Sequence, residues 1–191
     1  MKENKLKIKD LVTIGVFAVI YFVFMFGVGM IGVIPILFLI YPTILGIVTG
    51  TIIMLFMVKK PWSLFILGML SPLIMFLVGH TYVLVLHALV VMFIAEMIRR
   101  VGNYKSLKFN MIAFAVFNTW ICGSLMQMLW AREKYIELSM MMGKEYVDAL
   151  IELITYPHMA LVYAGALIGG LIGAYIGKIL LKKHFTKAGI A

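Results

Sequence analysis

The chain has 191 residues, of which 64% are hydrophobic and only 13% are charged, and its net charge is +9. Soluble globular proteins are about one quarter charged, so this composition excludes a soluble domain. One crossing of a bilayer takes about 20 apolar residues, and the chain therefore has room for about six. We expect an all-α integral membrane protein of about six transmembrane helices, in which residues 1–191 form a single membrane domain.

The positive charge is gathered in a few places. Fourteen of the 17 Lys and Arg residues lie in four segments: 2–9, 59–60, 99–108 and 178–187. Five of the eight acidic residues lie within residues 133–152. Basic loops stay on the cytoplasmic side of a membrane, so this pattern indicates membrane topology, and we expect no nucleic-acid partner.

The first two spans come from one long apolar run. Residues 11–58 carry no charge, and 48 residues are too many for one crossing. Glycines and a proline interrupt the run at residues 27–35, which predicts spans at 11–26 and 36–58. The residues between these spans either lie outside the membrane or form a re-entrant segment, which protein would have to shield.

Four further spans are predicted at residues 61–78, 82–98, 109–130 and 157–181. Pro61 and Pro157 suit the first turn of a helix. Six spans place all four basic segments on one side of the membrane. We therefore expect a multi-pass protein of a bacterial cell membrane with both termini in the cytoplasm.

Residues 131–156 would then form the largest external segment. Its second half alternates apolar and charged residues at helical spacing, which predicts an amphipathic helix. Such a segment is either a helix that lies on the membrane surface or a lid over an outward-facing cavity.

The spans contain almost no ionisable groups. Glu96 lies one turn from Arg99 and Arg100, which favours a local ion pair at the cytoplasmic interface. Ion-coupled transporters need charged groups within the membrane, and membrane hydrolases need an activated nucleophile or a metal site. The sequence has no motif for either, so we expect no enzymatic activity, no catalytic residue, and no cofactor or metal site of the protein's own.

Small residues form stripes on three predicted helices. Glycines recur every four residues from Gly165 to Gly177, Gly46 and Gly50 share a face, and Gly15 and Ala18 form a smaller notch. Such stripes let helices approach closely in lipid, either within the protein or against another protein.

Polar and aromatic residues gather on the outer side of this topology. His80, His87 and His158 belong to the outer half, whereas His184 is cytoplasmic. If a helix begins near His80, then His80 and His87 share one of its faces. Each such residue alone suits an interfacial belt, but together they suit a pocket for a flat organic ligand. The candidate substrate-binding residues are His80, Tyr82, His87, Asn118, Gln127, Trp130, Tyr135, Tyr156, His158 and Met159.

The opening segment KIKDLVTIGVFAVIYF, at residues 7–22, together with the size and topology, resembles a known family. It is similar to the S components, the substrate-binding membrane subunits of energy-coupling-factor (ECF) ABC transporters, in the Trep-Strep or MptD-like subfamily. The resemblance implies a protein that captures a micronutrient at the outer face. It also implies association with a membrane coupling subunit and two cytoplasmic ATPases, and rotation in the bilayer to deliver the ligand.

The family docks through small residues of its first helix in the pattern A-x-x-x-A. Here the small residues are Gly15 and Ala18, three apart, and with Phe22 they are the candidate partner-binding residues. The His, Tyr and Met residues near the outer mouth favour haem or another tetrapyrrole over a vitamin, with His80 or His158 as iron ligand. The alternative is a small polytopic membrane enzyme or a structural membrane subunit.

Overall fold

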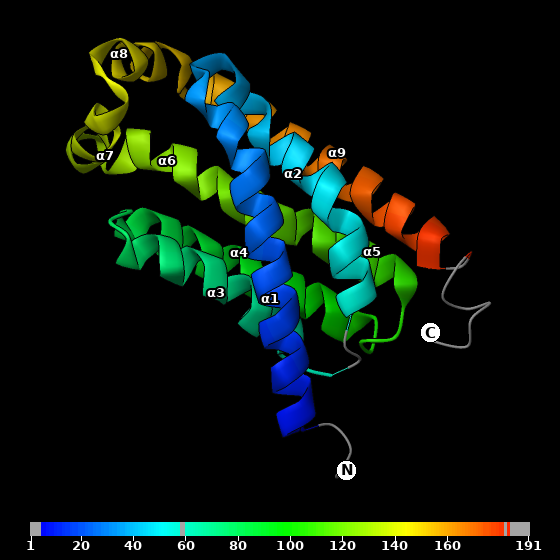
Figure 1. Ribbon diagram of the computed structural model, residues 1–191. Coiled ribbons are helices and arrows are strands. Elements are labelled where there is room, and N and C mark those ends of the chain that lie inside the picture. Colours follow the sequence, from blue (N-terminus) through cyan, green and yellow to red (C-terminus); the bar gives the residue numbers. More distant parts are fainter. Residues whose placement is uncertain (1–4, 58–59, 182, 184–191) are drawn as a thin grey trace.

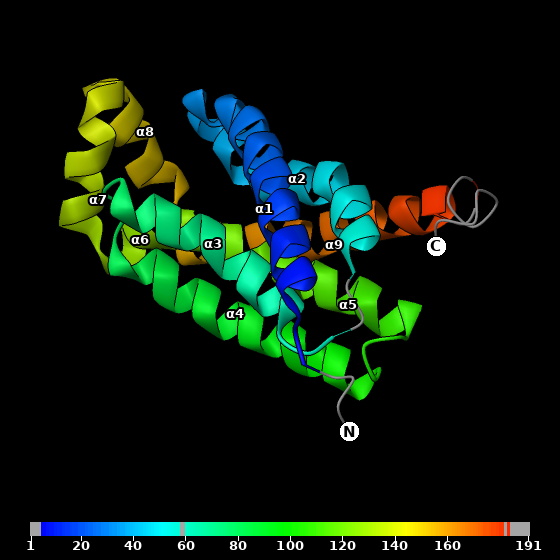
Figure 2. The ribbon, with the colours of Figure 1, turned by 60° about the horizontal axis from the view of Figure 1, so that its bottom comes forward.

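The computed structural model describes residues 5–57, 60–181 and 183, and in this part of the chain every element is a helix. The elements are α1 (Ile8–Gly29), η1 (Met30–Val33), α2 (Pro35–Phe56), α3 (Ser63–Leu77), α4 (Tyr82–Val101), α5 (Leu107–Asn118), η2 (Thr119–Ile121), α6 (Cys122–Trp130), α7 (Arg132–Ser139), η3 (Met140–Met142), α8 (Lys144–Leu153) and α9 (Tyr156–Leu180), where η marks a short 3₁₀ turn. Figures 1 and 2 show their arrangement.

Among the described residues, five helical stretches are long and apolar enough to cross a membrane: Ile8–Val33, Pro35–Phe56, Tyr82–Val101, Leu107–Trp130 and Tyr156–Leu180. The sixth apolar helix, α3, has 15 residues, which gives it a length of about 22 Å. That is less than the roughly 30 Å of a bilayer's hydrocarbon core. The all-α, multi-pass membrane architecture expected from composition is confirmed, and α3 is shorter than each of these five stretches.

The break predicted at residues 27–35 is present but shorter than predicted. Helix α1 continues to Gly29, η1 follows at once, and α2 begins at Pro35. Gly27 and Gly29 lie within α1, because glycine weakens a helix by about 1 kcal/mol, which is too little to end one that tertiary contacts hold. The interruption is thus reduced to a tight helical connection at residues 30–34.

Two other helix boundaries differ from the prediction. Pro61 precedes the N-cap residue Trp62, so it lies before α3 and not in its first turn. The predicted span at 109–130 is interrupted by η2, which separates α5 from α6. Pro157 does stand in the first turn of α9, as predicted.

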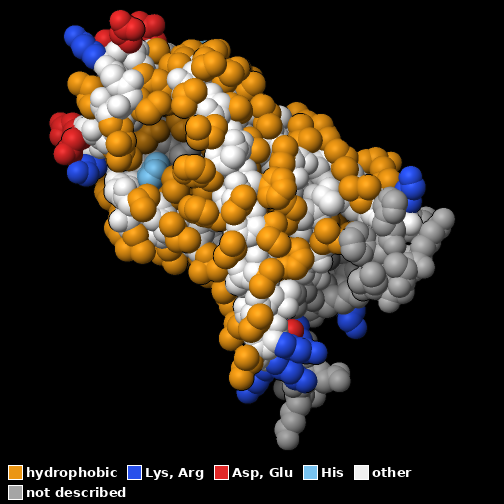
Figure 3. Space-filling model, viewed as in Figure 1, with side chains coloured by type: hydrophobic (Ala, Val, Ile, Leu, Met, Phe, Trp, Pro, Cys, Tyr) orange, Lys and Arg blue, Asp and Glu red, His pale blue; other side chains and the backbone are white. Residues whose placement is uncertain are grey.

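The charged side chains divide between two ends of the molecule. Figure 3 shows acidic side chains around α7 and α8, and basic side chains near the start of α1 and near the C-terminal end of α9. The connection between α4 and α5, with Arg100 and Lys105, lies toward this second end, which we call the basic end (Figures 1 and 2). Residues 2–4, 59, 182 and 184–187 of the basic segments, with His184 among them, lie outside the described residues.

Helices α2 and α9 pack along each other through glycines. A Cβ atom added to Gly50 would lie 2.1 Å from the carbonyl carbon of Gly173, and one added to Gly173 would lie 2.0 Å from the oxygen of Gly46. Such distances are impossible for real side chains, so only glycine allows this contact. The glycine stripes of these two helices therefore serve internal packing, which decides between the two alternatives left open by the sequence.

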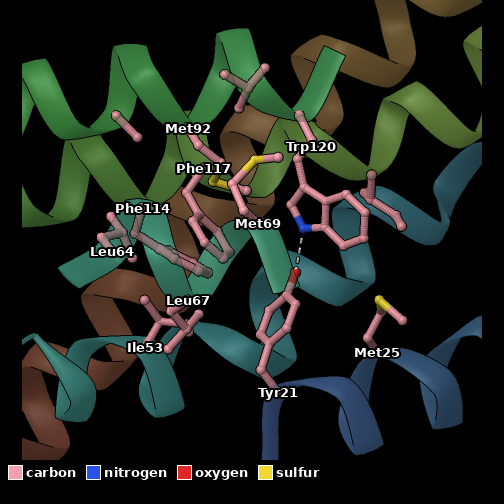
Figure 4. Close-up of a cluster of buried hydrophobic side chains, with 14 of the residues drawn as sticks. Tyr21, Met25, Ile53, Leu64, Leu67, Met69, Met92, Phe114, Phe117 and Trp120 are labelled. Carbon is pink, nitrogen blue, oxygen red and sulfur yellow. Dashed lines mark hydrogen bonds between the residues drawn. The ribbon is translucent and has the colours of Figure 1, made fainter. Parts of the chain in front are cut away.

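A buried aromatic pair joins α1 to the break between α5 and α6. The indole Nε1 of Trp120 donates a hydrogen bond of 2.8 Å to the hydroxyl oxygen of Tyr21, and both side chains are almost fully buried (Figure 4). Phe117 meets the Tyr21 ring edge-on, with ring centroids 5.5 Å apart. This contact fixes α1 against η2, directly below the cavity described next.

The predicted pair of Glu96 and Arg99 is present but deeply buried. The Arg99 Nη1 and Glu96 Oε2 atoms are 3.8 Å apart, and neither side chain is exposed to solvent. Arg99 also donates to Ser63 Oγ at 3.0 Å and to Asn110 Oδ1 at 3.2 Å. The pair thus holds α3, α4 and α5 together at the basic end, inside the protein and not at an exposed interface.

Candidate functional site

A cavity of about 210 Å³ opens at the end of the molecule that carries α7 and α8. We call it the outer pocket. Helix α1 and η1 form one wall of it, α2 a second, and the end of α3, the α3–α4 connection, η2 and the start of α6 the remainder. Its lining consists of Met25, Phe26, Gly29, Met30, Val33, Phe38, Tyr41, Met75, His80, Ile121 and Ser124.

Two of the three polar side chains in this lining are already engaged. The Tyr41 hydroxyl donates to the Met25 carbonyl oxygen at 3.0 Å, and the Ser124 hydroxyl donates to the Ile121 carbonyl oxygen at 2.6 Å. His80 uses its Nδ1 atom, while its Nε2 atom has no hydrogen-bond partner among the described residues. The side-chain donor that the outer pocket can offer a ligand is therefore His80 Nε2.

Gln127 fixes the orientation of His80. Its side chain is fully buried, its Oε1 atom accepts from the Thr81 backbone N–H at 2.6 Å, and its Nε2 atom lies 3.0 Å from both His80 Nδ1 and the Ser124 carbonyl oxygen. An amide nitrogen can only donate, so Nδ1 of His80 accepts and a neutral His80 carries its hydrogen on Nε2. Turning the amide over would set its NH₂ group against the Thr81 N–H.

Burial lowers the pKa of His80 below its ordinary value. The ring is thus held neutral near pH 7, with one N–H group left to donate. This arrangement suits an otherwise apolar ligand that carries one oxygen or nitrogen atom able to accept a hydrogen bond.

His87 does not share a helix face with His80, because α4 begins at Tyr82, after His80. Its Nδ1 atom lies 3.2 Å from the Trp120 carbonyl oxygen, and its Nε2 atom lies 2.5 Å from the Tyr163 hydroxyl. Both ring nitrogens are therefore occupied, and the ring joins α4, η2 and α9. His87 therefore has a structural role, and it does not line the outer pocket.

His158 also stands apart from His80. Its side chain is exposed, and its Nδ1 atom lies 2.6 Å from the Leu153 carbonyl oxygen. It borders a separate surface groove between α2 and α9, together with Ile40, Thr43 and Leu161. The predicted cluster of three histidines is thus not a single site.

The remaining predicted site residues fall into two groups. Tyr82, Trp130 and Tyr156 are about 60% exposed on the outer surface, as expected of an interfacial aromatic belt. Asn118, Tyr135 and Met159 are buried in the protein interior. None of these six lines the outer pocket.

Asn118 has a structural role of its own. Its Nδ2 atom donates to the Pro42 and Ala166 carbonyl oxygens at 2.8 and 2.9 Å, which ties α5 to α2 and α9. Asn118 and Gln127 therefore bond to different elements. The 3₁₀ turn η2 between them has about three residues per turn and changes the helical phase from Asn118 to Gln127.

The external segment covers part of the molecule's outer end. Val147 and Leu150 of α8 are buried, and the Tyr146 hydroxyl donates to the Gly32 carbonyl oxygen at 2.8 Å. On the other side, Leu138 of α7 lies next to Gly79, in the connection between α3 and α4. These contacts with protein at two rims of the outer pocket favour a lid over a helix that lies on lipid. Figure 3 shows a hollow beneath this segment, with a histidine side chain at its edge.

The predicted partner-binding residues lie together. Gly15, Ala18 and Phe22 of α1, with Ser71 and Ile74 of α3, border an apolar groove of about 270 Å³. A Cβ atom added to Gly15 would meet no other atom within 4 Å. Unlike the glycines of α2 and α9, Gly15 is therefore not occupied by internal packing.

Searches of curated proteins and of solved structures found no match. The model of a family described as hypothetical bacterial integral membrane proteins, Trep_Strep, matches residues 8–187. That range covers nearly the whole chain and all the helices described above. The chain therefore belongs to the Trep_Strep family of bacterial integral membrane proteins.

Proposed function

We propose that this protein is the substrate-binding subunit of an ECF-type transporter, which captures a micronutrient outside the cell and relies on separate ATPases for energy. The observation that carries the proposal is the outer pocket, which opens at the end opposite the basic segments and lies beside a two-helix lid. The basic end would face the cytoplasm by the positive-inside rule, so the pocket would face outward.

The energy for uptake would come from the partners. The Glu96–Arg99 pair, fully buried at the basic end, is engaged with Ser63 and Asn110 and is remote from the outer pocket's lining. A coupling ion needs a charged group near the substrate. This pair is better explained as a structural contact that holds three helices together. Because it does not serve as a coupling-ion site, it supports transport driven by ATP through other subunits.

The groove of Gly15, Ala18 and Phe22 is the proposed contact with the membrane coupling subunit. It is apolar, it lies on α1 and α3, and Gly15 leaves room for a partner helix. Close approach of helices in lipid depends on small residues of this kind. The groove and the outer pocket lie at different levels along α1 and share no lining residue, so a partner could bind without displacing the ligand.

The geometry favours a small, mostly apolar ligand with one hydrogen-bond acceptor. The cavity of about 210 Å³ is smaller than the roughly 300–1,000 Å³ of pockets for drug-sized molecules. An iron-bound histidine normally donates its other ring N–H to an acceptor, whereas Nδ1 of His80 faces the donating amide of Gln127. Haem therefore fits the proposal less well than a vitamin-sized molecule.

The experiment is to purify the protein from its native membranes in a mild detergent and to identify released small molecules by mass spectrometry. Met30→Trp should fill the outer pocket and His80→Ala should remove its donor, and both should lose the ligand. The matched control, His158→Ala, changes a histidine outside the pocket and should keep it. A ligand retained equally by all four proteins would contradict the proposed site, and a Soret band that depends on His158 would restore the haem hypothesis.

A further inference from the structure

A second concave site lies at the basic end, between the start of α3 and the connection from α4 to α5. It encloses about 870 Å³ and is bordered by Trp62, Met97, Arg100, Asn103, Tyr104 and Lys105. The transport proposal does not use this cavity, which we call the basic pocket. It is separate from the outer pocket and from the α1–α3 groove, and none of its lining residues is shared with them.

The basic pocket carries uncompensated positive charge. Arg100 and Lys105 are exposed, and within the described residues neither is paired with a carboxylate. The nearby acid, Glu96, is fully buried and accepts the Trp62 backbone N–H at 2.5 Å while it faces Arg99. The ligand that suits the basic pocket is therefore an anion.

The walls of the basic pocket are held in place. Trp62, Asn103 and Tyr104 have φ angles of 66°, 49° and 60°, and they are the three non-glycine residues with positive φ in the described chain. Such backbone costs about 1–3 kcal/mol per residue and persists only where surrounding contacts enforce it. Here the Tyr104 ring lies over the guanidinium of buried Arg99, with its centroid 5.4 Å away.

An apolar groove continues from the basic pocket along the surface of α3 and α4. It has a volume of about 330 Å³ and is lined by Phe65, Leu89, Val90, Phe93 and Ile94. Trp62 connects the two, because its ring lies 5.5 Å from the Phe65 ring and 6.4 Å from the Phe93 ring. Trp62 is 44% exposed, and a partly exposed Trp beside a basic cluster is typical of the membrane–water interface.

We propose that the basic pocket and this groove together bind one anionic phospholipid, with its phosphate beside Arg100 and Lys105 and an acyl chain along Phe65, Phe93 and Val90. The assignment rests on the order in which these groups follow one another. Two unpaired cations come first, at the interface, and would meet the phosphate. The Trp62 ring follows and would lie beside the lipid's glycerol, and the apolar groove then leads toward the membrane centre. Anionic lipids are attracted to such basic pockets beside transmembrane helices.

The test measures lipid binding to the full-length protein in neutral detergent by native mass spectrometry, with phosphatidylglycerol and phosphatidylcholine as probes. Phosphatidylglycerol should bind more tightly. The double variant Arg100→Gln/Lys105→Gln should lower its affinity about 25-fold, since each cation near the surface contributes roughly a factor of five. The matched control Lys108→Gln, which removes a neighbouring charge outside the basic pocket, should leave the affinity unchanged.

A groove variant separates lipid from other anions. Phe93→Ala should weaken both lipids while the preference for phosphatidylglycerol remains. Equal binding of the two lipids by the unaltered protein, or an unchanged affinity in the double variant, would overturn the proposal. So would soluble glycerol phosphate that binds as tightly as the lipid. A double variant that keeps its lipid but no longer co-purifies with transporter subunits would mark the basic pocket as a protein contact, which also overturns it.

Discussion

The hydroxyl group of Tyr146 donates a hydrogen bond of 2.8 Å to the backbone carbonyl oxygen of Gly32. The two residues are 114 positions apart, and the bond ties α8 of the external segment to the 3₁₀ turn between α1 and α2. Met30 and Val33 of the same turn line the outer pocket. This hydrogen bond therefore connects the proposed lid to a wall of the proposed binding site.

Tyr146→Phe should remove this hydrogen bond while it keeps the aromatic ring. We expect a loss of about 1 kcal/mol in the free energy that holds the lid closed, which is the usual net value of one hydrogen bond. Backbone amides of α8 and of residues 30–34 should then exchange hydrogen about fivefold faster. Tyr156→Phe, at an exposed tyrosine, is the matched control. Equal exchange in the two variants would show that the lid is held by other contacts.

Gln127 should be the most sensitive polar position near the outer pocket. Gln127→Leu removes the acceptor of the Thr81 N–H and leaves that buried group unpaired, which costs about 1–3 kcal/mol beyond the lost bonds. Thermal unfolding in detergent should show a clear drop in midpoint. Trp130→Leu, on the same helix but 58% exposed, should change it little. A similar midpoint for both variants would mean that Gln127 does not organise the turn.

The stability of the protein should fall in mild acid through His80. Its pKa is lowered in the folded state by burial, so the unfolded chain binds a proton more readily once the pH falls below about 6.5. The free energy of unfolding should decrease between about pH 7.5 and pH 5. His80→Gln should lose less over that range than the unaltered protein does. An identical pH dependence in the two proteins would show that His80 does not contribute.

The close contact of α2 and α9 should tolerate no added carbon. Gly50→Ala would place Cβ 2.1 Å from the Gly173 backbone and force the helices apart, which should cost about 3 kcal/mol. Gly15→Ala meets open space and should leave the unfolding midpoint unchanged. Both variants would be measured by thermal unfolding. A comparable loss of stability in the two would contradict the difference between the packed glycines of α2 and α9 and the open glycine of α1.

The helices could be predicted from the sequence because charge and proline bracket the apolar runs. Glu96, Arg99 and the basic residues near Lys105 mark the end of α4 and its connection to α5, and Pro157 marks where α9 begins. The break predicted at residues 27–35 is shorter in the structure for a physical reason. Glycine is a weak helix breaker in lipid, where the backbone gains most by keeping its own hydrogen bonds, and α1 therefore continues through Gly27.

The candidate site was predicted less completely. His80 was expected there and does line the outer pocket. Phe38, Tyr41 and Met75 were missed, because an apolar pocket residue has the same signature as any residue that faces lipid or core. The Tyr163–His87 contact could not be predicted either, since it depends on how α9 crosses α4.

The proposed transporter role rests on partners that the chain does not itself contain. Affinity purification of the protein from its native membranes in mild detergent tests that role most directly, with ATP hydrolysis and subunit composition as readouts. We predict a complex with a membrane coupling subunit and two ATPases, which Gly15→Leu and Ala18→Leu disrupt without loss of the bound ligand, because their side chains would fill the α1–α3 groove. Purification of the unaltered protein alone, without ATPase activity, would contradict the account.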